Sequence, residues 1–304
     1  MGAANEEPRI ARRGGIDIRV AYLGPRGTFS EEALSRLFPA GEVEPQPCRS
    51  IADAVFEAAE GRADAAFVPI ENSLEGSVNL TLDLLVHEVD LSIQGEVLLP
   101  VRQHLAARPG TALAQVRRVY SHPHALPQCR RLLRELAGVE VQTSASTAEA
   151  ARRVATEEGA AAICNALAVE IYHLAVLRPD VQDSPNNVTR FVLLGRGQPD
   201  PTGRDKTSVV FTLREDRPGA LCDALAEFAR RQINLSKLET RPTKAGYGSY
   251  LFFADLEGHR SELRVAEALA AVRRRCSFWK ELGSYPRAFL ASEERTRCAP
   301  PSGG

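Results

Sequence analysis

The amino-acid sequence predicts an α/β protein built from two parts, and three features of the chain lead to this fold class. Short apolar runs alternate with segments of helical spacing through the first two thirds of the chain. A stretch rich in glycine, proline and charge, residues 195–206, then interrupts this pattern. Beyond it, strands and helices are expected in a different order. We therefore expect a mainly parallel sheet with helices on both faces, followed by a separate, smaller domain.

The first part is expected to contain five strand–helix pairs. Each pair begins with a short apolar run typical of a buried strand and continues with apolar residues three and four positions apart, typical of a helix. Leu126, Cys129, Leu132 and Leu136 show this helical spacing. The expected pairs are residues 18–23 with 24–38, 63–70 with 71–89, 116–121 with 122–136, 139–145 with 146–159, and 160–165 with 166–177.

The second part begins with "TSVVFTL", in which Val209, Phe211 and Leu213 occupy alternate positions as in a half-buried strand. The order of elements after it is β-α-β-β-α-β, which predicts a ferredoxin-like arrangement. The expected strands are residues 207–213, 233–242, 248–258 and 277–286, and the expected helices are 216–232 and 261–275.

The composition is that of a soluble globular protein. The chain has 304 residues, of which 44% are hydrophobic and 25% charged, with a net charge of −1. This balanced charge does not indicate a surface that binds nucleic acid. No apolar run approaches the ~18 residues that span a membrane. Residues 1–17 lack the apolar core of a secretory signal and are expected to be a disordered lead-in. The expected location is therefore cytoplasmic.

The cysteines and histidines do not predict a metal site. Six cysteines are scattered without a CxxC pair, which is typical of reduced thiols. His122, His124 and Cys129 form the only cluster of possible ligands. Pro123 separates the two histidines and no second ligand pair follows, so we expect no metal there.

Short polar residues follow several of the expected strands, where the next helix begins. Parallel strands bring such ends to one edge of a sheet, where open α/β folds bind ligands. Helix starts offer unpaired N–H groups, so several of them together can hold a small anion. Helix capping explains any single one of these residues, but an anion site explains the whole set better. The set is Thr28, Ser30, Asn72, Ser73, Ser121, Ser146, Thr147 and Asn165.

The segment "NNVTRFVLLG" places Asn187, Thr189 and Arg190 immediately before an apolar run. A turn followed by a buried strand is one interpretation. The other is that Thr189 and Arg190 face a cleft in which a charged molecule binds. The residues by themselves leave both open.

Several segments occur in the order seen in prephenate dehydratases, and the chain resembles that family from about residue 19 to 285. The C-terminal segments "RPGALCDAL", "INLSKLETRP" and "YLFFADLEGH" resemble the ACT domain that accompanies these enzymes. The segments that carry the first resemblance are "YLGPRGTFSEEA", "VPIENSLEGSVNLTLDLL", "VYSHPHALPQC", "STAEAA", "AAICNALA" and "NNVTRFVLLG".

The resemblance implies a catalytic region like a type-2 periplasmic binding protein, with a cleft between two α/β lobes, and then an ACT domain. In such a fold Thr189 would lie where the chain returns to the first lobe, and would belong to the cleft. The implied division is a lead-in at 1–17, a catalytic domain at 18–197 (lobe 1 about 18–100 and 186–197, lobe 2 about 101–185), a linker at 198–206, an ACT domain at 207–286 and a tail at 287–304.

The implied reaction converts prephenate to phenylpyruvate, carbon dioxide and water without a cofactor. Hydroxide is a poor leaving group, so a donor must assist the departing oxygen, and the family pattern makes Thr189 that residue. A threonine hydroxyl is too weak an acid to act unaided, so it would donate a hydrogen bond or relay a proton from water. Asn72, Ser121 and Gln128 match substrate-binding positions. Arg190 would pair with a substrate carboxylate or form a structural ion pair between the lobes.

The ACT resemblance implies that phenylalanine binds at a subunit interface and inhibits, in a homo-oligomer that is a dimer or tetramer. The alternative is that the same residues only pair two subunits, with no ligand. The matching positions are Gly219, Ala220, Leu221, Asn234, Leu235, Glu239, Thr240, Arg241 and Pro242.

Two other functions remain open from the sequence. A two-lobed cleft can bind a small anion without reacting, because fold does not determine function. Arogenate dehydratase is a neighbouring activity, whose substrate carries an amine in place of the side-chain keto group. The motifs TRF, ENS and SHP weigh against a non-catalytic binding protein. The sequence does not separate prephenate from arogenate as the substrate or identify the effector amino acid.

Overall fold

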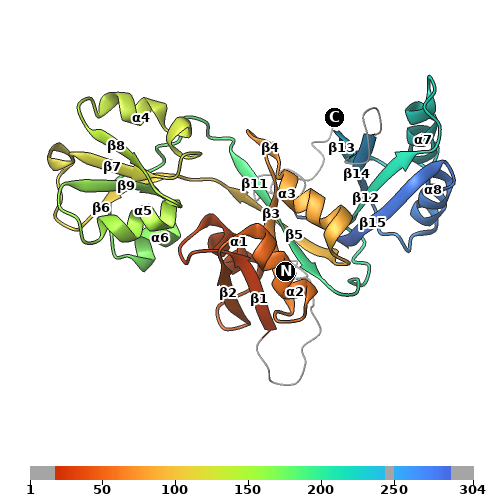
Figure 1. Ribbon diagram of the computed structural model, residues 1–304, viewed down its shortest axis with the longest axis horizontal. Coiled ribbons are helices and arrows are strands. Elements are labelled where there is room, and N and C mark those ends of the chain that lie inside the picture. The colour runs from red at the N-terminus through yellow and green to blue at the C-terminus, as the bar shows by residue number, and fades with distance from the viewer. Residues whose placement is uncertain (1–17, 244–249, 289–304) are drawn as a thin grey trace, which may run out of the picture.

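The computed structural model describes residues 18–243 and 250–288 and contains three sheets in a row along the molecule (Figure 1). The predicted lead-in, residues 1–17, and the predicted tail from residue 289 on lie outside the described residues. The fold class predicted from the sequence is confirmed: two α/β lobes precede a C-terminal domain of β-α-β-β-α-β order.

Lobe 1 is the part of the chain that contains the central sheet. Strands β1, β2 and β3 are parallel, whereas β11, which returns from lobe 2, runs antiparallel to both β3 and β5. The sheet is therefore mixed rather than mainly parallel. Its order is β2 (Val43–Cys48), β1 (Ile18–Leu23), β3 (Ala65–Asn72), β11 (Val188–Gly195) and β5 (Ser92–Pro100), with β4 (Gly76–Ser77) on β3, and its helices are α1 (Phe29–Leu37), α2 (Ile51–Ala59), α3 (Asn79–Asp83) and a π-helical turn (Leu84–Glu88).

The prediction for lobe 1 differs from the structure in two ways. Strands β2 and β5 and helix α2 were not predicted. Strand β2 contains Pro45 and Pro47 and has no apolar run. Proline is tolerated there because β2 is an edge strand. The helix expected over residues 71–89 begins only at Asn79, because strand β3 continues to Asn72 and then turns back as β4.

Lobe 2 has its own sheet, in which only the three strands β8, β7 and β9 are parallel. The strands β6 and β10 are antiparallel to their neighbours. The strand order is β10 (Ala175–Arg178), β6 (His104–Ala107), β9 (Ala160–Cys164), β7 (Arg118–Ser121) and β8 (Glu140–Thr143), and the helices are α4 (Arg130–Glu135), α5 (Thr147–Val154), α6 (Ala166–Ile171) and short 3₁₀ turns at Leu113–Gln115 and Leu126–Gln128.

The C-terminal domain is an antiparallel sheet with two helices, as the sequence predicted. Its strand order places the first strand in the interior and the second at one edge, which is the ferredoxin-like order. The elements are β12 (Asp205–Leu213), α7 (Ala220–Ala229), β13 (Leu235–Pro242), β14 (Tyr250–Glu257), α8 (Leu263–Arg273) and β15 (Cys276–Pro286), and the sheet order is β13-β14-β12-β15.

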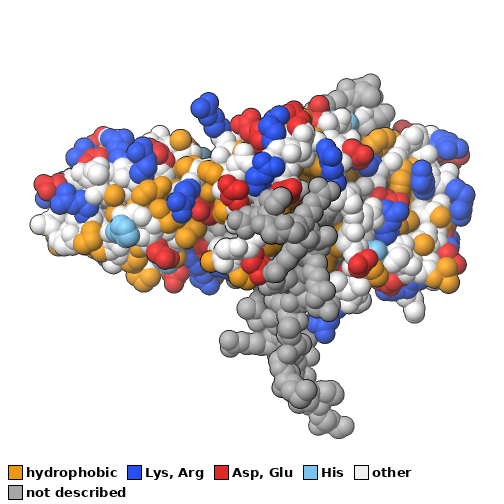
Figure 2. Space-filling view, turned by 90° about the horizontal axis from the view of Figure 1, so that it is seen from below, with side chains coloured by type: hydrophobic (Ala, Val, Ile, Leu, Met, Phe, Trp, Pro, Cys, Tyr) orange, Lys and Arg blue, Asp and Glu red, His pale blue; other side chains and the backbone are white. Residues whose placement is uncertain are grey.

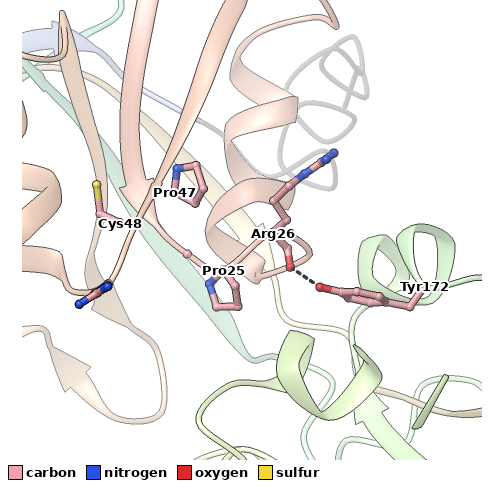
Figure 3. A pocket seen from close by; sticks show the side chains of 7 residues that line it. Pro25, Arg26, Pro47, Cys48 and Tyr172 are labelled. Atoms are coloured by element: carbon pink, nitrogen blue, oxygen red, sulfur yellow. Dashed lines mark hydrogen bonds between the residues drawn. The ribbon is translucent and has the colours of Figure 1, made fainter. Parts of the chain in front are cut away.

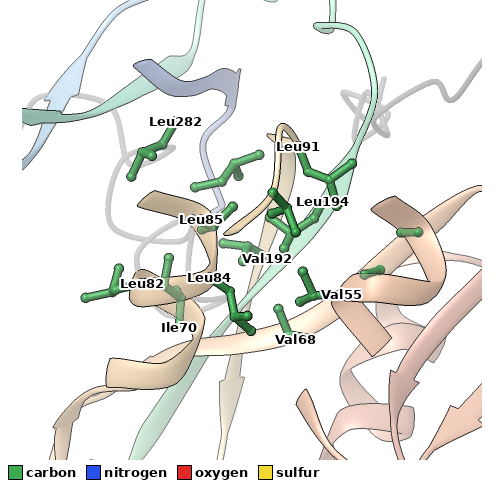
Figure 4. Close-up of a cluster of buried hydrophobic side chains, with 14 of the residues drawn as sticks. Val55, Val68, Ile70, Leu82, Leu84, Leu85, Leu91, Val192, Leu194 and Leu282 are labelled. Carbon is green, nitrogen blue, oxygen red and sulfur yellow. The ribbon is translucent and has the colours of Figure 1, made fainter. Parts of the chain in front are cut away.

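One hydrophobic cluster is shared by lobe 1 and the C-terminal domain. Val192 and Leu194 of the central sheet belong to it together with Leu282 of the C-terminal sheet (Figure 4). Val210 and Phe253 of the C-terminal sheet belong to the same cluster. Lobe 2 has a separate cluster to which neither of the other parts contributes a residue. Burial of apolar surface is the main stabilising contribution in folding, so lobe 1 and the C-terminal domain are held together by a common core.

The edge strands β5 and β15 pass very close to each other at Gly283. A Cβ atom at this glycine would lie 2.3 Å from the backbone oxygen of Ile93, so no larger residue fits. Three residues earlier on β15, the Lys280 ammonium donates to the backbone oxygens of Leu85 (2.7 Å) and Val89 (2.8 Å). The C-terminal domain is thus anchored to lobe 1 along β15.

Basic and acidic side chains are interspersed over the face shown in Figure 2, in keeping with the net charge of −1. Within residues 18–243 and 250–288, no helix has both the length and the apolar character needed to cross a membrane.

Candidate active site

The ends of β3 and β11 bring two of the predicted site residues together. The two strands are antiparallel neighbours, and their register places Thr189 directly opposite Asn72 (Figure 1). The Asn72 amide Nδ2 donates to Thr189 Oγ1 at 2.9 Å. Ser73 lies at the same place: its hydroxyl donates to the Asn186 oxygen and accepts from the Val188 N–H.

The orientation of the Asn72 amide determines what the Thr189 hydroxyl can do. Asn72 Oδ1 accepts from the backbone N–H groups of Leu74 (2.9 Å) and Glu75 (3.1 Å), so Nδ2 must face Thr189. Thr189 Oγ1 therefore acts as an acceptor toward Asn72. No hydrogen bond between described residues uses the Thr189 proton, which remains able to donate to a bound molecule.

A chain of amides continues from Asn72 to lobe 2. Asn72 Nδ2 also donates to Asn187 Oδ1 (2.8 Å), and Asn187 Nδ2 donates to Gln128 Oε1 (2.9 Å). Gln128 Nε2 then donates to Glu75 Oε1 (3.0 Å), whose other oxygen contacts His124 Nδ1 at 3.1 Å. Since Gln128 and His124 belong to lobe 2, this chain connects the two lobes beside Thr189.

A second group of predicted residues lies where helices of the two lobes face each other. The side chains of Ser146 and Asn165 accept from the first turns of α5 and α6. Asn165 Nδ2 donates across the lobe boundary to Glu32 Oε2 at 2.8 Å. A Cβ atom at Gly27, just before α1, would lie 3.4 Å from Ala148 of α5. The predicted residues Thr28, Ser30 and Thr147 are buried at these helix starts.

Two predicted substrate-binding residues, Ser121 and Arg190, form hydrogen bonds within the chain. Ser121 is fully buried, and its hydroxyl donates to the Ile163 oxygen at 2.8 Å, which ties β7 to β9. Arg190 points away from Thr189 into the boundary with the C-terminal domain, because neighbouring strand residues face opposite sides. Its guanidinium donates to Glu96 (2.7 Å), Asp255 (2.6 Å), the Tyr285 hydroxyl (2.7 Å) and Glu71 (3.4 Å).

The ion-pair alternative therefore describes Arg190, although its partners lie in lobe 1 and in the C-terminal domain rather than in lobe 2. Burial by itself would lower the Arg190 pKa, but Tyr285, Asp255 and Glu96 raise it well above its ordinary value. Burial would raise the Asp255 pKa, but Arg190 and Lys206 hold it below its ordinary value. Both groups are charged, and each compensates the other's loss of water.

The boundary between the lobes also contains a pocket of about 560 Å³ (Figure 3). It lies between the loops that follow β1 and β2 and the side chain of Tyr172, whose hydroxyl donates to the Arg26 oxygen at 3.2 Å. Arg26 and Arg49 are the charged residues of its lining. Asn72, Thr189 and Gln128 do not line it, so the pocket is separate from the Thr189 cluster.

Within one chain, the predicted effector residues fall into two groups. The register places Phe211 and Thr240 both opposite Phe252, so the start of α7 and the end of β13 lie toward one end of the sheet. Asn234 precedes the other end of β13, roughly 20 Å from Thr240 along an extended strand. The first group is Gly219, Ala220, Leu221, Glu239, Thr240, Arg241 and Pro242, and the second is Asn234 and Leu235.

The sequence did not single out every residue of the Thr189 cluster. Asn187 links Asn72 to Gln128 and is 1% exposed. Its place in the polar segment before Phe191 was a usable signal. Glu75 gave no signal, because an exposed glutamate in a turn is ordinary. Among the described residues, no group of three or more possible ligands is placed to hold a metal ion.

Comparison with known proteins identifies the family. The family model for prephenate dehydratase matches residues 20–199, and the model for the ACT domain matches residues 207–274. The chain belongs to the prephenate dehydratase family. The resemblance predicted from the sequence motifs is therefore confirmed, and so is the ACT domain.

Individual proteins of known name match most of this chain. A prephenate dehydratase of Mycolicibacterium vanbaalenii is 46% identical over 283 residues, covering 88% of this chain and 90% of that protein. The structure of prephenate dehydratase from Arthrobacter aurescens in complex with L-Phe matches with a TM-score of 0.81 and 42% identity, covering 89% and 90% of the two chains. GqqA, described as a novel type of quorum quenching acylase, matches with a TM-score of 0.80 and 32% identity, covering 89% and 98%.

Proposed function

We propose that this protein is a prephenate dehydratase whose catalytic residue is Thr189. The observation that carries the proposal is the Asn72–Thr189 hydrogen bond, which leaves the Thr189 proton free to donate. Family membership supplies the reaction, and the cluster supplies a donor at the boundary of the two lobes. The proposed catalytic domain and ACT domain follow the predicted boundaries, 18–197 and 207–286, and the matched ranges 20–199 and 207–274 support them.

The proposed reaction begins with the loss of the ring carboxylate of prephenate as carbon dioxide. The electron pair released moves through the ring, the carbon–oxygen bond to the hydroxyl group breaks, and the ring becomes aromatic. The departing hydroxide takes up one proton and leaves as water. Thr189 donates a hydrogen bond to this oxygen and passes on a proton from water, while Asn72 Nδ2 holds its oxygen in place.

The helix N-termini at the lobe boundary can bind the negatively charged carboxylates of the substrate. The N-termini of α1 and α5 carry unpaired N–H groups and the positive ends of helix dipoles. Thr28, Ser30, Ser146 and Thr147 surround these ends, and Gln128 and Ser73 lie at the Thr189 cluster. We propose that a carboxylate of prephenate binds at these helix starts, without direct pairing to Arg190.

The ACT domain is proposed to bind L-phenylalanine and inhibit the enzyme, as supported by the relative whose structure contains L-Phe. The two groups of effector residues, separated along β13, favour a site shared by two copies of the chain, because one copy presents them at opposite ends. A homo-oligomer is therefore part of the proposal. The cytoplasmic location expected from the sequence stays a prediction.

The test is an ultraviolet assay for phenylpyruvate with the wild-type chain and Thr189→Val. Wild type should convert prephenate, and the variant should lose about 10²- to 10⁴-fold in kcat with a smaller change in KM. A Thr189→Ser variant, which keeps the hydroxyl, is the matched control and should retain much of the activity. Equal kcat in wild type and Thr189→Val would remove Thr189 from the mechanism.

The same assay decides between the remaining functions. A non-catalytic binding protein would bind prephenate without forming phenylpyruvate. An arogenate dehydratase would show the higher kcat/KM with arogenate. Acylase chemistry has no support from the cluster, because an acyl-transfer nucleophile needs a neighbouring base and Thr189 Oγ1 instead accepts from an amide.

A further inference from the structure

Strand β13 of the ACT domain reaches the same β3–β4 hairpin that carries the Thr189 cluster. The Lys237 ammonium lies 3.2 Å from Glu71 Oε2 and 3.2 Å from Glu239 Oε2, and donates to the Ser77 hydroxyl at 2.8 Å. Ser77 in turn donates to Glu239. Lys237 is only 14% exposed, so water screens this contact weakly.

Glu71 connects this contact to the catalytic strand ends. The carboxylate oxygen that faces Lys237 also accepts from Arg190 at 3.4 Å. Glu71 is opposite Arg190 and Ser77 in the sheet, and the next position along β3 pairs Asn72 with Thr189. A displacement of Glu71 therefore moves the residue that orients Thr189.

The hairpin is too short to absorb such a displacement. Its ladder consists of two pairs, Glu71 with Ser77 and Asn72 with Gly76. The loop between them holds Glu75, which contacts Gln128 and His124 of lobe 2. The hairpin is thus tied to the ACT domain at Ser77, to Thr189 at Asn72 and to lobe 2 at Glu75.

We propose that Lys237 is a positioning residue, through which an effector bound on strand β13 of the ACT domain displaces Glu71 and, with it, the Asn72–Thr189 pair. The inference rests on the proposed dehydratase activity and adds the route by which the ACT domain affects it. Glu239 belongs to the proposed effector site on the same strand, two residues from Lys237. An effector bound at Glu239 changes the partners of Lys237 and thereby the position of Glu71.

Lys280→Met is a matched control for the test variant Lys237→Met. Both lysines belong to the ACT domain and bind lobe 1. Lys280, however, donates to backbone oxygens in the segment after α3, which is not part of the β3–β4 hairpin beside Thr189. Both variants are made in the full chain. Lys237→Arg keeps the positive charge and serves as the conservative variant.

In Lys237→Met, kcat without effector should stay within about threefold of wild type, because Asn72 and Thr189 keep their own hydrogen bonds. L-Phenylalanine should still bind within about twofold of the wild-type Kd by calorimetry, but the inhibition it causes should weaken by about fivefold or more. Lys280→Met and Lys237→Arg should be inhibited like wild type. Full inhibition of Lys237→Met, or equal loss in Lys280→Met, would overturn the proposal.

Amide hydrogen exchange tests this proposal independently of the proposed function, because the measurement does not require the protein to be catalytically active. Adding L-phenylalanine should change amide exchange over residues 71–77 in wild type and Lys280→Met, but not in Lys237→Met. An inactive wild type that still shows this pattern would refute the dehydratase activity and leave the route intact. An unchanged segment in wild type, or the same change in Lys237→Met, would refute the route.

Discussion

The boundary between lobe 1 and the ACT domain is apolar and ionic, whereas the boundary between lobes 1 and 2 is bridged by a few polar contacts. The first contains a shared hydrophobic cluster and the buried Arg190 network. The second has separate cores on its two sides and contacts such as Asn165 with Glu32 and Glu75 with Gln128. Both kinds of contact meet at the β3–β4 hairpin.

This difference indicates which parts of the molecule can move. Breaking a common core costs much more free energy than breaking exposed hydrogen bonds. We therefore expect lobe 1 and the ACT domain to behave as one body, against which lobe 2 opens and closes. Thr189 belongs to the body formed by lobe 1 and the ACT domain. The hydrogen bond from Asn187 to Gln128 connects the Thr189 cluster to the moving lobe 2.

Arg190→Met breaks the first boundary and should have the largest effect on stability. It leaves the buried carboxylate of Asp255 without the cation that pairs with it, which costs about 3–5 kcal/mol. Calorimetry should show one transition for lobe 1 and the ACT domain in wild type, and a lowered or divided transition in the variant. Arg62→Met removes an exposed arginine and should leave the transition unchanged. An unchanged profile for Arg190→Met would contradict the view of a single body.

The ionic contacts of this boundary should stabilise the protein less in acid. The difference in the free energy of unfolding between wild type and Asp255→Asn measures this loss. Because the pKa of Asp255 is held below its ordinary value, its stabilisation is complete above pH ~4 and is lost as pH falls through the lower, folded-state pKa. Wild type should exceed Asp255→Asn by about 1.5–3 kcal/mol at pH 7 in urea unfolding.

The gap between wild type and Asp255→Asn should narrow once the pH is below about 4. Asp255→Asn lacks the titrating carboxylate at position 255 but keeps all the other carboxylates. The effects of those other groups therefore cancel in the difference between the two proteins. A gap that is constant from pH 7 to pH 3 would show that the charge of Asp255 does not stabilise this boundary.

Glu75→Gln breaks the second boundary and should have the smallest effect on stability. The side chain of Glu75 is 46% exposed and that of His124 is 69% exposed, so the free energy of unfolding should change by less than about 1 kcal/mol. Catalysis should respond more, with kcat/KM about two- to tenfold lower, because a neutral amide at position 75 holds Gln128 and His124 of lobe 2 more weakly beside Thr189 than the carboxylate does. A loss of stability as large as that of Arg190→Met would make the two boundaries equivalent.

The sequence predicted the fold class because alternation and element order are local properties of the chain. It predicted Asn72, Thr189 and Gln128 through their motifs, and the structure brings these three into one cluster. It did not predict β2, since an edge strand with two prolines carries no apolar pattern. It also left Arg190 undecided, because Glu96 and Asp255 come from distant parts of the chain.

The close passage of β5 and β15 at Gly283 has a consequence for solubility. Each is the edge strand of its sheet, and an exposed strand edge is a template on which other chains aggregate. Here the two edges cover each other, while the outer edge of lobe 1, β2, is interrupted by Pro45 and Pro47. A side chain at position 283 would part the two strands and present both edges to other molecules.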